Sequence, residues 1–255
     1  MENLKAYIVQ PDVEWCSSEL NQERSENIIK TLNQPELVVF PEMFLTGFAV
    51  KDMGSAVSMN SKPVKWFQET ARKYNIAMMG SLLIKDEGKY YNRMLFSDRG
   101  KELQYYDKSH LFVLSDEAKN FTSGKRRVIF ETAGWKIFPQ ICYDLRFPDF
   151  SYNDLDYDII VYSANWPAER IEHWEILLKA RAVENQSYVL GCNRVGTDMN
   201  GIIYNGNSMI IGPGGKVLAR AHEREYILDH ALSADHIKEM RSRLPFLKTA
   251  RPKTA

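Results

Sequence analysis

The sequence predicts an α/β fold with mixed sheets. Short apolar runs rich in Val, Ile, Tyr and Phe recur along the whole chain, and amphipathic helical segments separate several of them, as in layered α/β proteins. Three turn sequences are typical of tight reversals between adjacent strands: Ser97-Asp98-Arg99-Gly100, Thr132-Ala133-Gly134 and Gly212-Pro213-Gly214-Gly215. Antiparallel pairs are therefore expected among parallel ones, which makes a purely doubly wound sheet the less favoured arrangement.

Ten strands are predicted where an apolar run is short and bounded by turn residues. They are Lys5 to Val9, Leu37 to Phe40, Ile76 to Leu83, Tyr91 to Ser97, Glu102 to Tyr106, Arg127 to Glu131, Lys136 to Cys142, Asp158 to Ser163, Tyr188 to Arg194 and Gly206 to Gly212. Four helices are predicted where apolar positions recur at steps of three and four residues. They are Ser17 to Leu32, Lys62 to Tyr74, Ala168 to Gln186 and Ala234 to Ser242.

The third predicted helix carries polar side chains on its inward stripe. Ile171, Trp174, Leu178, Ala182 and Asn185 share this stripe at about 100° per residue, and Arg181 falls at its edge. An isolated buried charge is unstable, so a carboxylate or several carbonyls are expected to meet Arg181. We interpret Arg181 and Asn185 as structural residues behind the site, in preference to direct substrate contacts.

Composition restricts the class of protein and its partners. The 255 residues, 44% of them hydrophobic and 26% charged, are expected to form one domain, with a tail from about 244 to 255 where the periodicity is lost. Thirty-three basic residues balance 33 acidic ones without a run of like charges, so a small molecule is a better partner than nucleic acid.

Three cysteines without CxxC spacing favour free thiols over a disulfide framework or a structural metal site. The chain has neither a signal-like start nor an apolar run of roughly 18 residues. We therefore expect a cytoplasmic protein that is not embedded in a membrane.

Three segments share one pattern, in which an apolar strand ends abruptly in a compact polar group. Glu42 ends LVVFPE, Lys108 ends YYDK, and Cys142 lies in IFPQICYD. Catalytic groups commonly lie where a rigid strand passes into a loop. Charged residues follow Cys142 at once, so its thiolate is expected to be stabilised by a neighbouring cation. Cys16, in a loop, and Cys192, inside an apolar strand, lack this context.

These segments resemble the nitrilase superfamily of carbon–nitrogen hydrolases. The resemblance rests on VVFPEM, YYDKSHLF and QICYDLRFP, supported by HWEILLKARAVENQ and GNSMIIGPGGKVLA, and it covers nearly the whole chain. Within the superfamily the chain is most similar to the bacterial omega-amidases, through VFPEMFLTGF, DKSHLF, SANWP and CNRVG. The resemblance implies a four-layer α-β-β-α sandwich, a homodimer or higher homo-oligomer, and neither metal nor cofactor.

The resemblance also implies roles for the site residues. Cys142 is the nucleophile, Glu42 the general base, and Lys108 the oxyanion donor together with the backbone N–H of Tyr143. Glu117 matches a second family carboxylate that orients Lys108 or the substrate. The implied activity is hydrolysis of the side-chain amide of small 2-oxo dicarboxylate monoamides, such as 2-oxoglutaramate and 2-oxosuccinamate, through a cysteine thioester.

The sequence also suggests further site residues and leaves other functions open. Asn165 and Trp166 follow a predicted strand and are expected to wall the substrate pocket, with packing of Trp166 in the core as the alternative. Arg146 is either an anchor for a substrate carboxylate or part of a structural ion pair. A Cys-His enzyme with His110 or His173 as base is disfavoured because no third residue is expected to orient either ring. Other superfamily amidase, nitrilase or carbamoyl-amide activities, and an inactive scaffold protein, remain as alternatives. Gly206, Ser208, Pro213 and Gly215 match a family hairpin and are interpreted as architecture.

Overall fold

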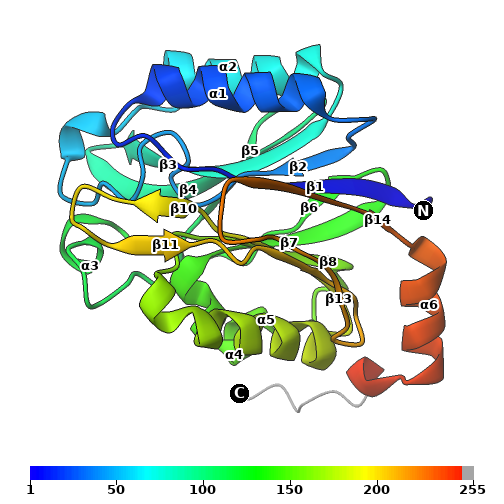
Figure 1. The fold of residues 1–255 in the computed structure, drawn as a ribbon. Coiled ribbons are helices and arrows are strands. Elements are labelled where there is room, and N and C mark those ends of the chain that lie inside the picture. The colour runs from blue at the N-terminus through cyan, green and yellow to red at the C-terminus, as the bar shows by residue number, and fades with distance from the viewer. Residues whose placement is uncertain (249–255) are drawn as a thin grey trace.

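Two six-stranded mixed sheets pack face to face, with helices on both outer faces (Figure 1). The structure is a computed structural model that describes residues 1–248. From one outer face to the other, the layers are α1 (Ser18–Thr31) with α2 (Lys62–Lys73), the first sheet, the second sheet, and α5 (Ile171–Asn185) with α4 (Pro148–Ser151). This is the four-layer α-β-β-α sandwich that the sequence resemblance implied.

The first sheet has the strand order β14-β1-β2-β3-β4-β5. Its strands are β1 (Leu4–Gln10), β2 (Leu37–Val39), β3 (Ala77–Asp86), β4 (Lys89–Asp98), β5 (Gln104–Asp107) and β14 (Tyr226–Leu232). The central strands β1, β2 and β3 are parallel, whereas β14, β4 and β5 join their neighbours in antiparallel pairs. The sheet is therefore mixed, as predicted.

The second sheet has the order β13-β12-β9-β8-β7-β6. Its strands are β6 (Phe130–Thr132), β7 (Trp135–Ile141), β8 (Ile159–Ser163), β9 (Tyr188–Cys192), β12 (Met209–Ile211) and β13 (Val217–Arg220). Strands β7, β8 and β9 are parallel, and the other pairs are antiparallel. A separate two-stranded hairpin is formed by β10 (Val195–Thr197) and β11 (Ile203–Asn205).

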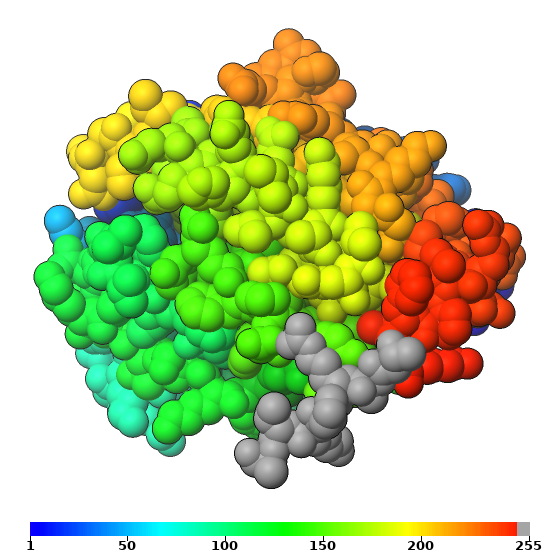
Figure 2. Space-filling model, turned by 90° about the horizontal axis from the view of Figure 1, so that it is seen from below, coloured from blue at the N-terminus to red at the C-terminus, as the bar shows by residue number. Residues whose placement is uncertain are grey.

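Helices α1 and α2 cover the outer face of the first sheet, and α4 and α5 cover that of the second. The short helix α3 (Glu117–Asn120) and the helix α6 (Ala234–Arg243) lie at the edges of the sandwich. Short 3₁₀ turns are η1 (Met53–Ser55), η2 (Cys142–Arg146), η3 (Ala168–Arg170) and η4 (Phe246–Lys248). Figure 2 views the molecule from the α5 side, with α5 in yellow-green across the middle and α6 in red at one edge. Within residues 1–248, no helix is long and apolar enough to cross a bilayer.

Alternation along the central strands explains why the sheets form two layers. In β8, Ile159 and Val161 pack into the core between the sheets, whereas Ile160 and Tyr162 pack toward α5. Strand β2 alternates in the same way, so both strands are buried on both faces. Buried strands of this kind are almost continuously apolar, which is why their sequences were recognisable.

All ten predicted strands occur, and the three predicted reversals join β4 to β5, β6 to β7 and β12 to β13. Several predicted ends were wrong. The strand expected to include Cys142 stops at Ile141, and the runs 127–131, 188–194 and 206–212 shrink to Phe130–Thr132, Tyr188–Cys192 and Met209–Ile211. Strands β10, β11, β13 and β14 were missed, because each leaves at least one face partly exposed and carries polar residues there.

The four predicted helices are present, with α5 preceded by the turn η3. Arg181 is 3% exposed, and it donates to the carbonyl of Leu145 at 2.6 Å and to Glu184 Oε1 at 2.8 Å. The predicted carboxylate and carbonyl partners are therefore confirmed. Asn185 is also buried, and its side-chain oxygen accepts the Asn153 N–H. The predicted tail begins inside the described part at Leu244, and its residues 249–255 lie outside it.

A buried arginine fixes the strand that carries Lys108 to its neighbours. The side chain of Arg93 on β4 is 3% exposed and binds both carboxylate oxygens of Asp107 at 2.7 and 3.0 Å. Its remaining terminal nitrogen binds Asp86 at 2.9 Å. Since Asp107 ends β5 directly before Lys108, this bidentate pair fixes the point at which Lys108 leaves the sheet.

We expect Arg93→Gln to lower the free energy of unfolding by about 2 to 3 kcal/mol, because it leaves Asp107 partly buried without its cation. Urea denaturation followed by circular dichroism measures this change. Lys101→Gln is the control, since Lys101 is 72% exposed where it pairs with Asp98 and is expected to contribute under about 1 kcal/mol. Equal losses in the two variants would contradict a stabilising role for Arg93.

Candidate active site

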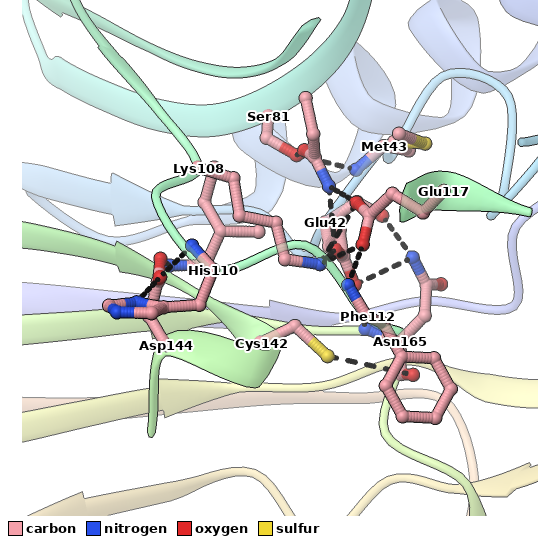
Figure 3. A network of polar contacts seen from close by, with 12 residues as sticks. Glu42, Met43, Ser81, Lys108, His110, Phe112, Glu117, Cys142, Asp144 and Asn165 are labelled. Carbon is pink, nitrogen blue, oxygen red and sulfur yellow. Dashed lines mark hydrogen bonds and ion pairs between the residues drawn. The ribbon is translucent and has the colours of Figure 1, made fainter. Parts of the chain in front are cut away.

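Three strand ends bring Glu42, Lys108 and Cys142 together (Figure 3). Glu42 follows β2, Lys108 follows β5 directly, and Cys142 follows β7 directly, so the site draws on both sheets. Glu42 is 0% exposed and Lys108 is 1% exposed. The sequence pattern of strands that end in polar groups thus identified side chains that do lie close together.

The ammonium group of Lys108 lies between two buried carboxylates. Its Nζ is 2.8 Å from Glu42 Oε1, 2.8 Å from Glu117 Oε2 and 3.0 Å from Glu117 Oε1. Burial alone would lower the pKa of Lys108, but the negative charges of Glu117 and Glu42 outweigh it and raise the pKa above its ordinary value. Lys108 is therefore a permanently charged hydrogen-bond donor at neutral pH.

The two carboxylates are held by further donors. Asn92 Nδ2 is 2.7 Å from Glu42 Oε1 and 3.0 Å from Glu117 Oε1, and the backbone N–H of Phe112 donates to Glu117 Oε2 at 2.7 Å. The backbone N–H of Asn165 donates to Glu42 Oε2 at 2.8 Å. Burial raises the pKa of Glu117, although the charge of Lys108 opposes the increase. Glu117 is fully buried, so it does not belong to a surface loop.

The backbone at the cysteine is sharply bent. Cys142 has a φ of +46° and begins the turn η2, which corrects the prediction that it belongs to the preceding strand. A non-glycine residue in this region costs roughly 1 to 2 kcal/mol, and such strain persists only where the surroundings enforce it. Asp144 enforces it here, since its Oδ2 accepts the N–H of Ile141 at 2.9 Å. The bend presents the thiol at the strand end.

The thiol of Cys142 is a protonated group at rest. Burial raises its pKa well above the ordinary value and the charge of Glu42 raises it further, whereas Lys108 acts in the opposite direction without prevailing. The neighbouring cation Lys108 therefore favours the thiolate as predicted, but burial and the charge of Glu42 outweigh its effect on the pKa. The Cys142 Sγ lies 3.9 Å from the carbonyl oxygen of Asn165, and Glu42 is the neighbouring carboxylate whose charge acts most strongly on the thiol.

Asp144 joins the lysine segment to the cysteine turn. Its Oδ1 accepts the backbone N–H of His110 at 2.9 Å and lies 2.8 Å from the His110 ring Nδ1, and its Oδ2 accepts the Tyr106 hydroxyl at 2.9 Å. The expectation that nothing orients His110 was thus wrong. The ring stacks on Phe147 at 3.7 Å between centroids, and the charges acting on the thiol of Cys142 come from Glu42, Lys108 and Glu117. His110 is therefore part of the scaffold.

A cavity of about 490 Å³ opens in front of Cys142. Asn165 and Trp166 line it, as predicted, and so do Tyr143 and Arg146. The further lining residues are Trp15, Phe48, Val50, Lys51, Asp52, Phe112, Leu114, Ser115, Asp116, Pro167, Arg170, Asn200, Ile202 and Tyr204. A cavity of this size with aromatic walls and a few polar groups suits a small molecule.

Three contributors to the site were not singled out from the sequence. Asn92 lies inside β4, Ser81 inside β3, and Asp144 in the turn after Cys142. The Ser81 hydroxyl donates to Asn92 Oδ1 at 2.8 Å and accepts the backbone N–H of Met43 at 2.8 Å. One signal in the sequence could have revealed these hydrogen bonds. Asn92 and Arg93 are polar residues within the strand sequence YYNRMLF, and polar side chains buried in a strand need hydrogen-bond partners.

Comparison with known families and relatives agrees with this geometry. The carbon-nitrogen hydrolase family matches residues 5–242. The omega-amidase YafV of Escherichia coli strain K12 is 39% identical over 246 residues, which are 96% of each chain. The 2-oxoglutaramate amidase of Bacillus subtilis strain 168 is 31% identical over 243 residues, which are 93% of each chain.

A solved structure shares the whole fold. A CN-hydrolase superfamily protein from Xanthomonas campestris, crystallised with an arsenic adduct in its active site, superposes with a TM-score of 0.97. The two chains are 34% identical, and the match covers 100% of both. The four-layer architecture described above is thus the architecture of that superfamily.

Because the pKa of Cys142 is raised, we expect its alkylation by iodoacetamide to accelerate with pH beyond pH 9, without a plateau near neutrality. Glu42→Gln removes a negative charge beside the thiol, so the midpoint of the pH–rate profile is expected to fall. Mass spectrometry of the labelled peptide in a Cys16→Ser background measures both profiles.

Cys192 is the internal control for this measurement, because it is fully buried and should stay unlabelled while the protein is folded. A wild-type rate that already reaches its plateau below pH 8 would show a resting thiolate and contradict the expectation.

Proposed function

The chain belongs to the carbon-nitrogen hydrolase family and is an amidohydrolase of that family, and from this premise we propose that it is an omega-amidase. Its substrates are small 2-oxo dicarboxylate monoamides such as 2-oxoglutaramate and 2-oxosuccinamate, which it converts to the dicarboxylate and ammonia. The observation that carries the reaction type is the buried Lys108 ammonium shared by two carboxylates beside a cysteine. The chain is similar over almost its full length to an omega-amidase and to a 2-oxoglutaramate amidase, and this similarity supports the substrate class.

Acylation begins when the Cys142 sulfur attacks the amide carbonyl carbon. Glu42 accepts the thiol proton as the carbon–sulfur bond forms, since the thiol is protonated at rest. The carbonyl oxygen becomes an oxyanion, which the Lys108 ammonium and the backbone N–H of Tyr143 stabilise; each such donor contributes roughly 3 to 4 kcal/mol in comparable sites. The carbon–nitrogen bond then breaks, and Glu42 returns the proton to the departing ammonia.

Deacylation uses the same groups in a second cycle. Water attacks the thioester carbonyl, and Glu42 accepts a proton from that water while Lys108 again stabilises the oxyanion. Breakage of the carbon–sulfur bond releases the new carboxyl group, and the proton held by Glu42 restores the thiol. No group besides these side chains and water is required for the proton balance.

The other predicted residues have supporting roles in this proposal. Glu117 orients Lys108, because both of its carboxylate oxygens lie within 3.0 Å of Nζ. Asn165 fixes Glu42 through its backbone N–H and, at 2.7 Å, through its side-chain amide to the Glu42 carbonyl. Trp166 and Arg146 wall the cavity, and the Arg146 guanidinium lies 5.0 Å from the centre of a Trp166 ring.

The remaining expectations about the protein belong to the same proposal. A family match over residues 5–242 supports one catalytic domain. The free thiols of Cys16, Cys142 and Cys192 support a cytoplasmic location. The outer face of α5 exposes Ile176 by 65% and Val183 by 49%, which supports a homodimer that covers this face (Figure 2).

Replacing a catalytic residue should abolish turnover without unfolding the protein. We expect Cys142→Ala, Glu42→Gln and Lys108→Ala each to lower kcat/KM for 2-oxoglutaramate by at least roughly 10³-fold, about 4 kcal/mol of barrier. Ammonia release measures this, with glutamine, asparagine and a simple nitrile as comparison substrates. Preference for another substrate with the same dead variants would refute only the substrate class, whereas an active Cys142→Ala would refute the mechanism.

Glu117→Gln tests the orienting role separately. The amide keeps the shape of the side chain but removes one of the two charges that hold Lys108, so kcat is expected to fall about 100-fold while KM changes little. Steady-state ammonia release gives both constants. Glu23→Gln on the exposed face of α1 is the matched control and should behave like the wild type. An unchanged kcat in Glu117→Gln would exclude the role.

A further inference from the structure

The proposed substrates carry a carboxylate at the end opposite the amide, and the cavity offers three cations to bind it. Lys51, Arg146 and Arg170 line the cavity together with Cys142. These cations differ in how fully their charge is already used within the protein. The inference below rests on the proposed function, since it concerns the recognition of that substrate carboxylate.

Lys51 is a poor anchor because its ammonium group is largely solvated. Its side chain is 71% exposed and lies 3.5 Å from Asp116. Asp52, a second carboxylate, also lines the cavity near this point of the chain. An exposed ammonium beside carboxylates contributes little to the binding of another anion.

Arg146 already has an internal partner. Its Nη2 lies 3.0 Å from Nδ1 of His173, and its guanidinium carbon lies 5.0 Å from the centre of a Trp166 ring. These contacts fix the guanidinium against the wall of the cavity. Its hydrogen-bond partner His173 is exposed, so Arg146 is the alternative anchor that the test below must separate from Arg170.

Arg170 combines a fixed position with a weakly engaged guanidinium. Its ion pair is to Glu169 at 3.4 Å, and the Glu169 side chain is 84% exposed while that of Arg170 is 29% exposed. The backbone of Arg170 is held in η3, where its carbonyl accepts the Trp166 indole N–H at 2.8 Å and its N–H donates to Pro167 at 3.1 Å. The guanidinium lies 5.5 Å from the centre of the Phe112 ring.

We propose that Arg170 is the specificity-determining residue that binds the distal carboxylate of the substrate. A guanidinium presents two parallel N–H donors that match the two oxygens of a carboxylate, and a solvent-exposed partner such as Glu169 is readily exchanged for a ligand. Phe112 links this end of the cavity to the catalytic groups, since its ring lies under Arg170 and its N–H holds Glu117. The carboxylate bound at Arg170 directs the amide end of the substrate toward Cys142.

The test compares one acidic amide with its uncharged counterpart. In 4-oxopentanamide a methyl group replaces the carboxylate of 2-oxoglutaramate, while the ketone and the amide are retained. Ammonia release is measured from both compounds with the wild type, Arg170→Gln, Arg170→Lys and Arg146→Gln. Arg24→Gln on the exposed face of α1 is the matched control. Circular dichroism confirms that each variant is folded.

We expect Arg170→Gln to lower kcat/KM for 2-oxoglutaramate by about 30- to 100-fold and that for 4-oxopentanamide by less than about 3-fold. Arg170→Lys should recover part of the loss, because it keeps the charge without the paired donors. A wild type that prefers 2-oxoglutaramate and a variant Arg170→Gln that keeps this preference would overturn the inference alone. Loss of the preference in Arg146→Gln instead would assign the anchor to Arg146. A wild type without any preference for the acidic amide would overturn the proposed substrate class, and the anchor with it.

Discussion

The burial of one positive charge organises the whole site. The ammonium of Lys108 has no exposed surface at its side chain, and an isolated ion in that position would be strongly destabilising. Two carboxylates compensate it, and their excess negative charge is in turn met by donors from Asn92, Asn165 and Phe112. Strands β2 and β5 of the first sheet and β7 of the second must therefore all end near Lys108. The compensation of this buried charge therefore also restricts where the polypeptide can turn.

The fold was predictable where burial produces a simple hydrophobic pattern in the sequence. Strands such as β2 and β8 are buried on both faces, so they read as apolar runs with turns at each end. Strand β14 was missed because only every second residue of its inner face, Leu228 and Leu232, is buried, while the polar His230 between them on that face is partly exposed. The turn at Cys142 was missed because the left-handed backbone at this non-glycine residue depends on Asp144, and Asp144 is held in turn by Tyr106 and His110, which are far away in the sequence.

The site was predictable in its identities and less so in its energetics. Strand-end position and family resemblance identified Glu42, Lys108 and Cys142, and the structure places all three together. The protonation of the thiol depends on burial and on the competing charges around it, which a linear pattern does not contain. Sequence reasoning also passed over Asp144, because its role consists of hydrogen bonds that join two segments far apart in the chain.

The assembly of the site from both sheets has a consequence for folding. Glu42 is bound to Lys108 across 66 residues of chain and to Asn165 across 123, and the hydroxyl of Ser163 donates to the carbonyl of Phe40 between the sheets. Closing such long loops costs conformational entropy before the stabilising contacts have formed, so native pairings of this kind form slowly. A chain in which only one sheet has folded holds Cys142 without Glu42 and Lys108, or the reverse. The return of enzymatic turnover after denaturation therefore reports the docking of the sheets, and recovered secondary structure alone does not imply it.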